Sequence, residues 1–319
     1  MATMRAMAVE SFGPAESLRE MRLDPPLVGP DYVLIRVAAA GVNPVDGKLR
    51  GGSLAGAFPH IFPVIPGWDA AGTVEQVGPA VTGHVVGDRV LAYCRQDYIG
   101  GGTYAELVSV RAAHVASAGG MDLMAAGGLP LAGLTAYQCL HEAVAIEPGE
   151  TVVIRGASGG VGHLGVQLAR IAGARVIAIA GGGAESFVRE LGAEDFVDYR
   201  AGDVAGAIRA LRPDGVDAFV DFAGGDELGT LLATVRTGGR AASILVREAP
   251  DAAERDIAFR YVFVRPEAGQ LAAMVAMADS GDLRVEIDEI LPLDRAGTAQ
   301  SRLEAGGGTR GKLVLRVGG

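Results

Sequence analysis

The spacing of hydrophobic residues changes near residue 150, and the change predicts two kinds of architecture. Before it, short runs of alternating apolar and polar residues, at 32–41, 70–78 and 88–93, are separated by Gly and Pro. Such runs are typical of a β-rich, barrel-like domain. After it, apolar strands alternate with amphipathic helices, as in TVVIR (151–155) followed by VGHLGVQLARIAG (161–173). This alternation predicts a parallel sheet covered by helices on both faces.

The chain after Leu245 shows a mixed pattern again. It predicts a helix over 266–281, a strand over 284–291 and a last strand over 312–317. We interpret this tail as a return to the first domain.

Composition narrows the class of protein. The 319 residues are 49% hydrophobic and carry a formal net charge of −10, so they offer no basic face for nucleic acid. Glu10 follows the start before any long apolar stretch develops, which makes the cytoplasm the default location.

The uncharged stretch Leu123–Leu140 is interrupted by Pro130 and predicts a buried helical linker rather than a membrane span. Two cysteines, Cys94 and Cys139, support neither a disulfide framework nor a zinc site.

A glycine-rich turn between strand and helix is the strongest chemical signal. In GASGGVG (156–162), small residues stand at Ala157, Gly159 and Gly162 in the pattern A-x-G-x-x-G, with Ser158, Gly160 and Val161 between them. Small residues there allow a tight reversal, close approach of a pyrophosphate, and close packing of helix on sheet. Free N–H groups at the helix start would bind the phosphates. Glycine turns of this kind also occur for packing reasons alone, but the strand–turn–helix–strand context favours a dinucleotide.

The end of the next strand bears on the choice of dinucleotide. A carboxylate there would bind the ribose hydroxyls of NAD and repel the extra phosphate of NADP. No acid stands between Ala180 and Gly183, and Glu185 is the nearest carboxylate. The candidates for holding a phosphate, Arg189, Tyr199 and Arg200, lie farther along. We predict NADP(H), with NAD as the alternative.

Seven segments together give a family resemblance that spans nearly the whole chain. They are AAGVNPVDGKLRGG (39–52), IPGWDAAGTVEQVG (65–78), VGDRV (86–90), LTAYQCL (134–140), GASGGVGHLGVQLA (156–169), LGAEDFVDY (191–199) and RGKLVLRV (310–317). The chain resembles the medium-chain dehydrogenase/reductase superfamily, in its zinc-free quinone oxidoreductase branch. The resemblance implies an α/β fold: a GroES-like β-barrel catalytic domain over 1–122 and 256–319, a Rossmann domain over 123–255, and a cofactor in the cleft between them. It also implies a homodimer.

The same resemblance argues against zinc. Zinc-dependent relatives need Cys and His ligands where this chain has Asn43 and Trp68, and they carry a group of four cysteines that is missing here. The five histidines are scattered without metal-site spacing.

Several site residues follow from the resemblance. It places Asn43 and Thr135 near the nicotinamide, although Asn43 could instead only cap the helix after Pro44, and Thr135 could be a core hydroxyl. Lys48 stands where many relatives carry a proton-donating tyrosine, so it is a candidate catalytic residue with Asn43; a solvated surface lysine is the alternative. Further cofactor contacts are predicted at Gly181, Tyr199, Arg200, Ala223, Leu245 and Phe263. Residues 45–60 and 93–104, together with Phe263, are predicted to line the substrate site.

Without a metal, the natural reaction is hydride delivery to an acceptor that is already electrophilic. We therefore predict a zinc-independent, NADPH-dependent reductase of quinones or α,β-unsaturated carbonyl compounds. The alternatives are an enoyl-thioester reductase or biosynthetic tailoring reductase, and a regulator that binds NADPH without catalysis. The predicted partners are a small-molecule substrate and a second copy of the chain, with no membrane and no nucleic acid.

Overall fold

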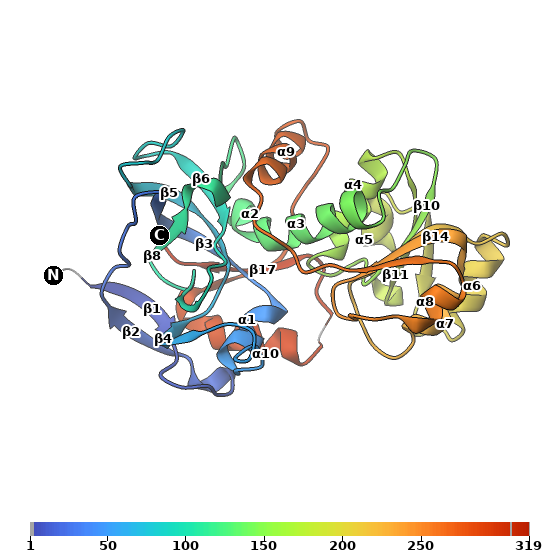
Figure 1. Cartoon of the computed structure of the whole chain (residues 1–319), viewed down its shortest axis with the longest axis horizontal. Helices are drawn as coiled ribbons and strands as arrows, with labels where there is room; N and C mark the ends of the chain where they lie inside the picture. The colour runs from blue at the N-terminus through green and yellow to red at the C-terminus, as the bar shows by residue number, and fades with distance from the viewer. Residues whose placement is uncertain (1–2, 307, 319) are drawn as a thin grey trace. The chain divides into compact units, whose positions relative to one another are not determined.

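The computed structural model describes residues 3–306 and 308–318, which form two units (Figure 1). Residues 1–131 and 266–319 form the mixed-sheet unit, and residues 132–265 form the parallel-sheet unit. The chain thus divides at 131/132 and 265/266, whereas the sequence predicted boundaries at 122/123 and 255/256. Helix α2 (Leu123–Gly128) packs against strands β3 (Tyr32–Val42) and β5 (Asp69–Val77) of the mixed-sheet unit, and strand β15 (Ala258–Tyr261) extends the parallel sheet.

The mixed-sheet unit is built around one long strand, β3, which pairs with β17, β5 and β8. Its main sheet has the order β16-β17-β3-β5-β6-β9, and β1-β2 and β4-β7 form two small sheets. Besides β3 and β5, the strands are β1 (Met4–Ala8), β2 (Arg19–Leu23), β4 (His60–Ile65), β6 (Arg89–Tyr93), β7 (Ile99–Gly101), β8 (Leu107–Arg111), β9 (Val115–Ser117), β16 (Ile287–Pro292) and β17 (Lys312–Arg316). The helices are α1 (Pro44–Arg50), α2, α9 (Ala268–Asp279) and α10 (Ala296–Glu304), with short 3-10 turns at Ala15–Ser17, Ala112–His114 and Leu293–Arg295.

The end of β3 is the part of this unit that positions a candidate site. Val42, its last residue, pairs with Leu313 of antiparallel β17, so Asn43 follows beside the start of that strand. On the other side of β3, β5 begins at Asp69 and also runs antiparallel. Three strand ends from distant parts of the sequence therefore meet at one place. The apolar alternation that predicted these strands buries Val33, Ile35 and Val37 of β3 in the core.

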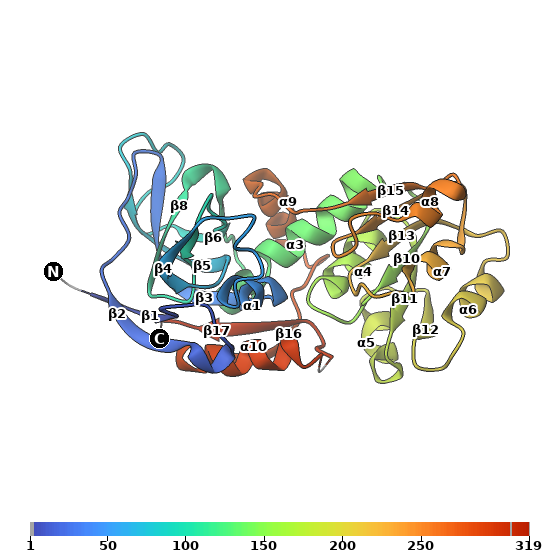
Figure 2. The same cartoon turned by 60° about the horizontal axis from the view of Figure 1, so that its bottom comes forward.

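The parallel-sheet unit is a doubly wound fold. Its six strands run parallel in the order β12-β11-β10-β13-β14-β15, which Figure 2 shows from edge to edge. Figure 2 also shows α4 and α5 on one face of the sheet and α6 and α7 on the other. The elements are α3 (Pro130–Tyr137), a π-helical turn (Gln138–Ala143), β10 (Thr151–Arg155), α4 (Gly162–Ile171), β11 (Arg175–Ala180), a 3-10 turn (Gly182–Ala184), α5 (Glu185–Glu190), β12 (Asp195–Asp198), α6 (Val204–Leu211), β13 (Val216–Asp221), α7 (Leu228–Leu232), β14 (Val235–Ser243), α8 (Pro250–Glu254) and β15.

The strand order has a functional meaning. It reverses direction between β10 and β13, and ligands of such sheets bind outside the carboxyl ends of the strands at this switch point. The strands and helices predicted between 151 and 245 are confirmed in type and order, whereas β15 was not predicted, because the chain after Leu245 was assigned to the first domain.

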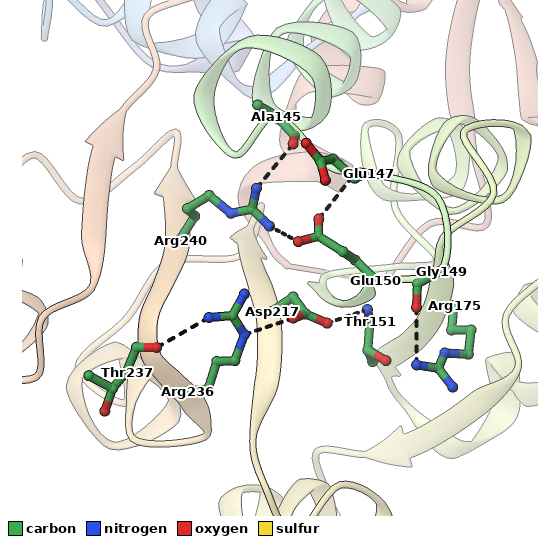
Figure 3. A network of polar contacts seen from close by, with 10 residues as sticks. All are labelled: Ala145, Glu147, Gly149, Glu150, Thr151, Arg175, Asp217, Arg236, Thr237 and Arg240. Atoms are coloured by element: carbon green, nitrogen blue, oxygen red, sulfur yellow. Dashed lines mark hydrogen bonds and ion pairs between the residues drawn. The ribbon is translucent and has the colours of Figure 1, made fainter.

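The amino ends of the strands are joined by a polar network (Figure 3). The Glu150 carboxylate pairs with Arg240, which also donates to the carbonyl oxygen of Ala145 at 3.1 Å. The Asp217 carboxylate accepts hydrogen bonds from the Thr151 N–H and from Arg236 Nε, both at 2.8 Å. These contacts tie β10, β13 and β14 together at the edge opposite the glycine turn.

The uncharged stretch 123–140 is helical, as predicted, and consists of α2, α3 and part of the π-helical turn. No helix among the described residues has the length and apolar character needed to cross a membrane. Cys94 and Cys139 are both free and buried.

Candidate functional site

The predicted cofactor residues gather at the carboxyl edge of the parallel sheet. Each group of them follows the carboxyl end of a different strand: the glycine turn after β10, Gly181 after β11, Tyr199 and Arg200 after β12, Ala223 after β13, Leu245 after β14 and Phe263 after β15. Because all six strands are parallel, these positions share one edge. Thr135 lies outside this series, in α3, where its side chain is buried.

The glycine turn combines a tight reversal of the chain with close packing of α4. Gly156 adopts a φ of +78°, the left-handed region that favours glycine, so the tight reversal expected at Ala157 is made one residue earlier. The N–H groups of Gly156 and Ala157 both donate to the Ile179 carbonyl oxygen, at 3.0 and 3.1 Å. A methyl group at Gly162 would lie 2.1 Å from the Gly156 carbonyl oxygen, so glycine is required for α4 to pack this closely. Ser158, Gly159, Gly160 and Val161 stay partly accessible between these anchors.

A guanidinium group lies beside Gly181, at the end of β11. Arg200 Cζ is 3.4 Å from the position that a Cβ atom would take on Gly181. Arg200 Nε donates to the Tyr199 hydroxyl at 3.2 Å, and the guanidinium lies 5.3 Å from the Tyr199 ring centre. Its terminal nitrogens have no hydrogen-bond partner within the described ranges, so they are available to an anion. Sequence reasoning placed Arg200 too far away to be decisive, and the fold brings it to the strand end.

Two carboxylates also lie near this strand end. Asp198 accepts the Arg200 backbone N–H at 2.9 Å, and it lies close to Gly182, so it is nearer to the strand end than the sequence indicated. Glu185, the carboxylate that sequence reasoning named, forms an ion pair with Arg189 in α5 at 2.9 Å. Arg189 is thereby engaged within its own helix.

Three further polar residues at the same edge were missed by sequence reasoning. Asp221 is fully buried, and its Oδ1 atom accepts hydrogen bonds from the N–H groups of Ala223 and Gly224 at 3.1 and 3.0 Å. Its Oδ2 atom accepts the Ser243 hydroxyl at 2.8 Å, and Arg155 Nη1 lies 3.6 Å from Oδ1. Asp221 therefore fixes the loop after β13 that carries Ala223. The signal available in the sequence was an aspartate at the end of a largely apolar strand, whose burial only the structure shows.

A second polar cluster lies in the mixed-sheet unit, where β3, β5 and β17 meet. Asn43, Asp69 and Lys312 are all at most 3% exposed. Asn43 Nδ2 donates to Asp69 Oδ2 at 2.8 Å, and Lys312 Nζ donates to Asn43 Oδ1 at 2.5 Å. Lys312 Nζ also donates to the Val42 carbonyl oxygen at 3.1 Å and lies 3.8 Å from Asp69 Oδ2. We call these three side chains the Asn43 cluster.

Asp46 adjoins this cluster and is also fully buried. Its Oδ2 atom accepts the Asn43 N–H at 2.8 Å and the Tyr104 hydroxyl at 2.9 Å, whereas Oδ1 has no partner among the residues described. Burial raises the pKa of Asp46 to about 7, and repulsion from Asp69 adds to this, against the opposing effects of the two hydrogen bonds and Lys312. Burial also raises the pKa of Asp69 to about 6 and lowers that of Lys312.

The structure confirms Asn43 as a helix cap, and its place near the nicotinamide stays a prediction. Asn43 is the N-cap residue of α1, and its backbone N–H bonds to Asp46, while its side chain belongs to the cluster. Lys48 is exposed on α1, and Asp46 faces inward, so the two do not pair. Trp68 is buried, with ring contacts to Phe58 and Tyr93.

Two models of known protein families match parts of this chain. Residues 29–119 match the alcohol dehydrogenase GroES-like domain, and residues 191–315 match a domain described as zinc-binding dehydrogenase. A chloroplast envelope quinone oxidoreductase homolog of Arabidopsis thaliana is 35% identical over 204 residues, which cover 62% of this chain and 61% of that protein. The chain thus spans about three fifths of the length of this relative.

Solved structures match over the full length. The quinone oxidoreductase from Coxiella burnetii is 31% identical, with a TM-score of 0.90, and the match covers 99% of this chain and 100% of that one. A mycobacterial protein complexed with NADPH is 28% identical, with a TM-score of 0.86, over 98% of this chain and 100% of that one. The strand order and the turn after β10 define a doubly wound, Rossmann-type fold. The chain belongs to the medium-chain dehydrogenase/reductase superfamily, in its quinone oxidoreductase branch.

Proposed function

We propose that the protein is an NADPH-dependent reductase that transfers hydride to a quinone or an α,β-unsaturated carbonyl compound. The proposal rests on the carboxyl edge of the parallel sheet. There the turn 156–162 would bind the pyrophosphate, and Arg200 would bind the further phosphate of NADPH. The NADPH-bound mycobacterial structure and the quinone oxidoreductase relatives support the same reading. A bound nicotinamide would supply the hydride.

The preference for NADPH is proposed to depend on Arg200. Its terminal nitrogens lack partners within the described part of the chain, and bonds from a guanidinium to a phosphate are charge-assisted. Because such bonds contribute about 1.5–3 kcal/mol, we expect Arg200→Ala to weaken NADPH binding roughly 10- to 100-fold. NADH, which lacks the extra phosphate, should bind almost unchanged. Calorimetric titration of both nucleotides measures the two affinities.

Arg189→Ala is the matched control, because Arg189 is also an arginine near this strand end but pairs with Glu185. It should change neither affinity. An Arg200 variant that loses NADPH and NADH equally, or keeps both, would contradict the proposed phosphate contact.

Zinc independence is part of the proposal. The name of one matching domain implies zinc, so the residues must be tested for their ability to hold it. The ligand positions carry an amide at Asn43 and an indole at Trp68, which are not zinc ligands. In addition, the Lys312 ammonium group lies beside Asn43 and Asp69 and would repel a second cation. These residues do not fit a catalytic zinc ion, and metal analysis of the purified protein tests this.

Lys48 is retained as a proposed proton donor or anchor for an anionic acceptor. Its side chain is exposed and free to reach a bound molecule. Because general acids commonly contribute about 10²-fold or more, we expect Lys48→Ala to lower turnover by about tenfold or more while NADPH affinity changes little. Steady-state kinetics with the best acceptor, alongside nucleotide titration, measures both. Unchanged turnover would remove Lys48 from the mechanism.

A panel of acceptors tests the function as a whole. Oxidation of NADPH should be measured with benzoquinone, phenanthrenequinone, hexenal and crotonyl-CoA. Turnover with the first three supports the proposal, and a clear preference for crotonyl-CoA would indicate an enoyl-thioester reductase instead. Tight NADPH binding without oxidation by any acceptor would favour a regulator. The homodimer and the cytoplasmic location remain predictions from the sequence.

A further inference from the structure

The orientation of one amide group in the mixed-sheet unit is set from both sides by charges. Asn43 Nδ2 faces the Asp69 carboxylate at 2.8 Å, and Asn43 Oδ1 faces the Lys312 ammonium group at 2.5 Å. Turning the amide over would place its NH₂ group against the ammonium and its oxygen against the carboxylate. Both contacts would become repulsive, so only one orientation is stable.

The two charged residues are themselves held in place. Asp69 uses its second oxygen, Oδ1, to accept the Leu131 N–H at 2.7 Å, and Lys312 Nζ donates to the Val42 carbonyl oxygen at 3.1 Å. Both side chains are at most 2% exposed and start the strands on either side of β3 in the same sheet. The charges therefore cannot turn away to solvent. A buried ion pair is often no more stabilising than packed apolar residues of similar volume, so the position of these two charges on either side of an amide points to a role beyond stability.

The amide keeps unused hydrogen-bonding capacity. Nδ2 carries two hydrogens, one of which goes to Asp69, and the other has no partner within the part of the chain that the structure describes. The Asn43 cluster thus offers one N–H of fixed direction.

We infer that Lys312 and Asp69 are positioning residues, which hold the Asn43 amide so that its free N–H donates to a carbonyl oxygen of a bound molecule. The inference rests on the proposed function, in which both the nicotinamide carboxamide and the acceptor carry such an oxygen. On the acceptor, this oxygen gains negative charge as the hydride arrives, and a donor fixed in advance toward it lowers the reaction barrier; on the nicotinamide, the same donor would fix the orientation of the carboxamide. Lys312 and Asp69 act only through Asn43.

The decisive variant combines Asp69→Asn with Lys312→Met. The pair is then neutral, and removing both buried charges together avoids leaving either one unpaired. The amide oxygen introduced at position 69 continues to accept the Leu131 N–H, so the NH₂ group introduced there faces Asn43. Asn43 must turn its own oxygen toward that group, and its amide is reversed.

We expect the double variant to fold, with a Tm within about 5 °C of wild type, while its catalysis falls roughly 10²-fold. A loss of kcat with unchanged NADPH affinity assigns the bound oxygen to the acceptor, and a loss of NADPH affinity assigns it to the cofactor; both support the inference. Asp288→Asn with Arg302→Met is the matched control, because it neutralises another ion pair of the same unit. Its kcat should match wild type. A folded double variant with wild-type kcat and affinity would overturn the inference.

A spectroscopic measurement tests the orientation of the Asn43 amide independently of catalysis. Asn43 is the only asparagine in the 319 residues, so labelling with ¹⁵N asparagine gives a single side-chain NH₂ signal in the wild-type protein. We expect one of its two hydrogens to be shifted strongly downfield by the Asp69 carboxylate. Two hydrogens at ordinary shifts would overturn the inference even if the double variant failed to fold. If the wild-type protein oxidises no NADPH but shows the shifted signal, the proposed function fails while the amide orientation stands.

Discussion

Gly162→Ala should destabilise the parallel-sheet unit and remove nucleotide binding together. The added methyl group would lie 2.1 Å from the Gly156 carbonyl oxygen and 2.7 Å from the Ala157 Cα atom. Both are backbone atoms of the turn, so α4 would have to move away from β10 instead of a side chain adjusting. Overpacking of this kind costs about 1–3 kcal/mol or more. We expect Tm to fall by several degrees and NADPH affinity to drop below detection in calorimetry.

Gly159→Ala separates these two effects. A methyl group there meets only the Gly156 carbonyl oxygen, at 3.4 Å, which is close to ordinary van der Waals distance. Its Tm should therefore stay near that of wild type, while NADPH binding weakens because the backbone can no longer approach the pyrophosphate as closely. A Gly162 variant with wild-type Tm and affinity would show that the close approach of α4 to the turn is not needed.

Asp46→Asn should change how stability depends on pH. Burial raises the pKa of Asp46 to about 7, whereas the unfolded chain has the ordinary value of about 3.9. Between these values the folded protein keeps a proton that the unfolded chain has released, so wild-type stability falls as pH rises from about 4 to about 7. Asparagine does not titrate, and its oxygen can still accept from Asn43 and Tyr104. We expect the variant to gain Tm relative to wild type as pH increases over this range.

The gain should amount to several degrees between about pH 4.5 and about pH 8, because one pKa unit corresponds to about 1.4 kcal/mol and the side chain is fully buried. Thermal unfolding curves across that range measure it. Parallel curves for the two proteins would show that Asp46 is charged throughout.

Asp217→Asn is a control in which stability should depend on pH in the opposite direction. Burial raises the pKa of Asp217, but the Thr151 N–H and the Arg236 guanidinium outweigh it and hold the pKa below its usual value. Asp217 therefore stabilises the fold above about pH 4, and this contribution is lost as pH falls further. Replacing it should reduce stability at neutral pH and bring the two curves together in acid.

The parallel-sheet unit could be predicted from the sequence in some detail. Apolar strands and amphipathic helices have distinct periods, and their alternation between 151 and 245 indicated the right elements in the right order, although the last strand, β15, was missed. The site at the carboxyl edge followed, because parallel strands bring the ends of distant segments together. The identity of the residue that makes the reversal did not follow, since the left-handed φ of Gly156 depends on how β10 leaves the sheet.

The Asn43 cluster could be predicted only in part. The sequence indicated Asn43, but a lysine or aspartate at the start of a strand normally faces solvent, so Asp69 and Lys312 gave no signal of burial. Their meeting depends on the register of β3 with β5 and β17, over separations that periodicity cannot specify. The scarcity of lysine drew attention to the exposed Lys48, whose role stays a prediction, but nothing in the sequence indicated that the second lysine, Lys312, is buried.

The order of β17 and β3 along the chain has a consequence for synthesis on the ribosome. Strand β17 lies beside β3 in the sheet, yet it is translated only after the whole of residues 132–265. The parallel-sheet unit is one continuous segment and can complete its sheet while the chain is still growing. The mixed-sheet unit must wait with an open β3 edge and an uncompensated Asp69 until Lys312 leaves the exit tunnel. A nascent chain arrested before that residue therefore carries a complete parallel-sheet unit beside an incomplete mixed-sheet unit.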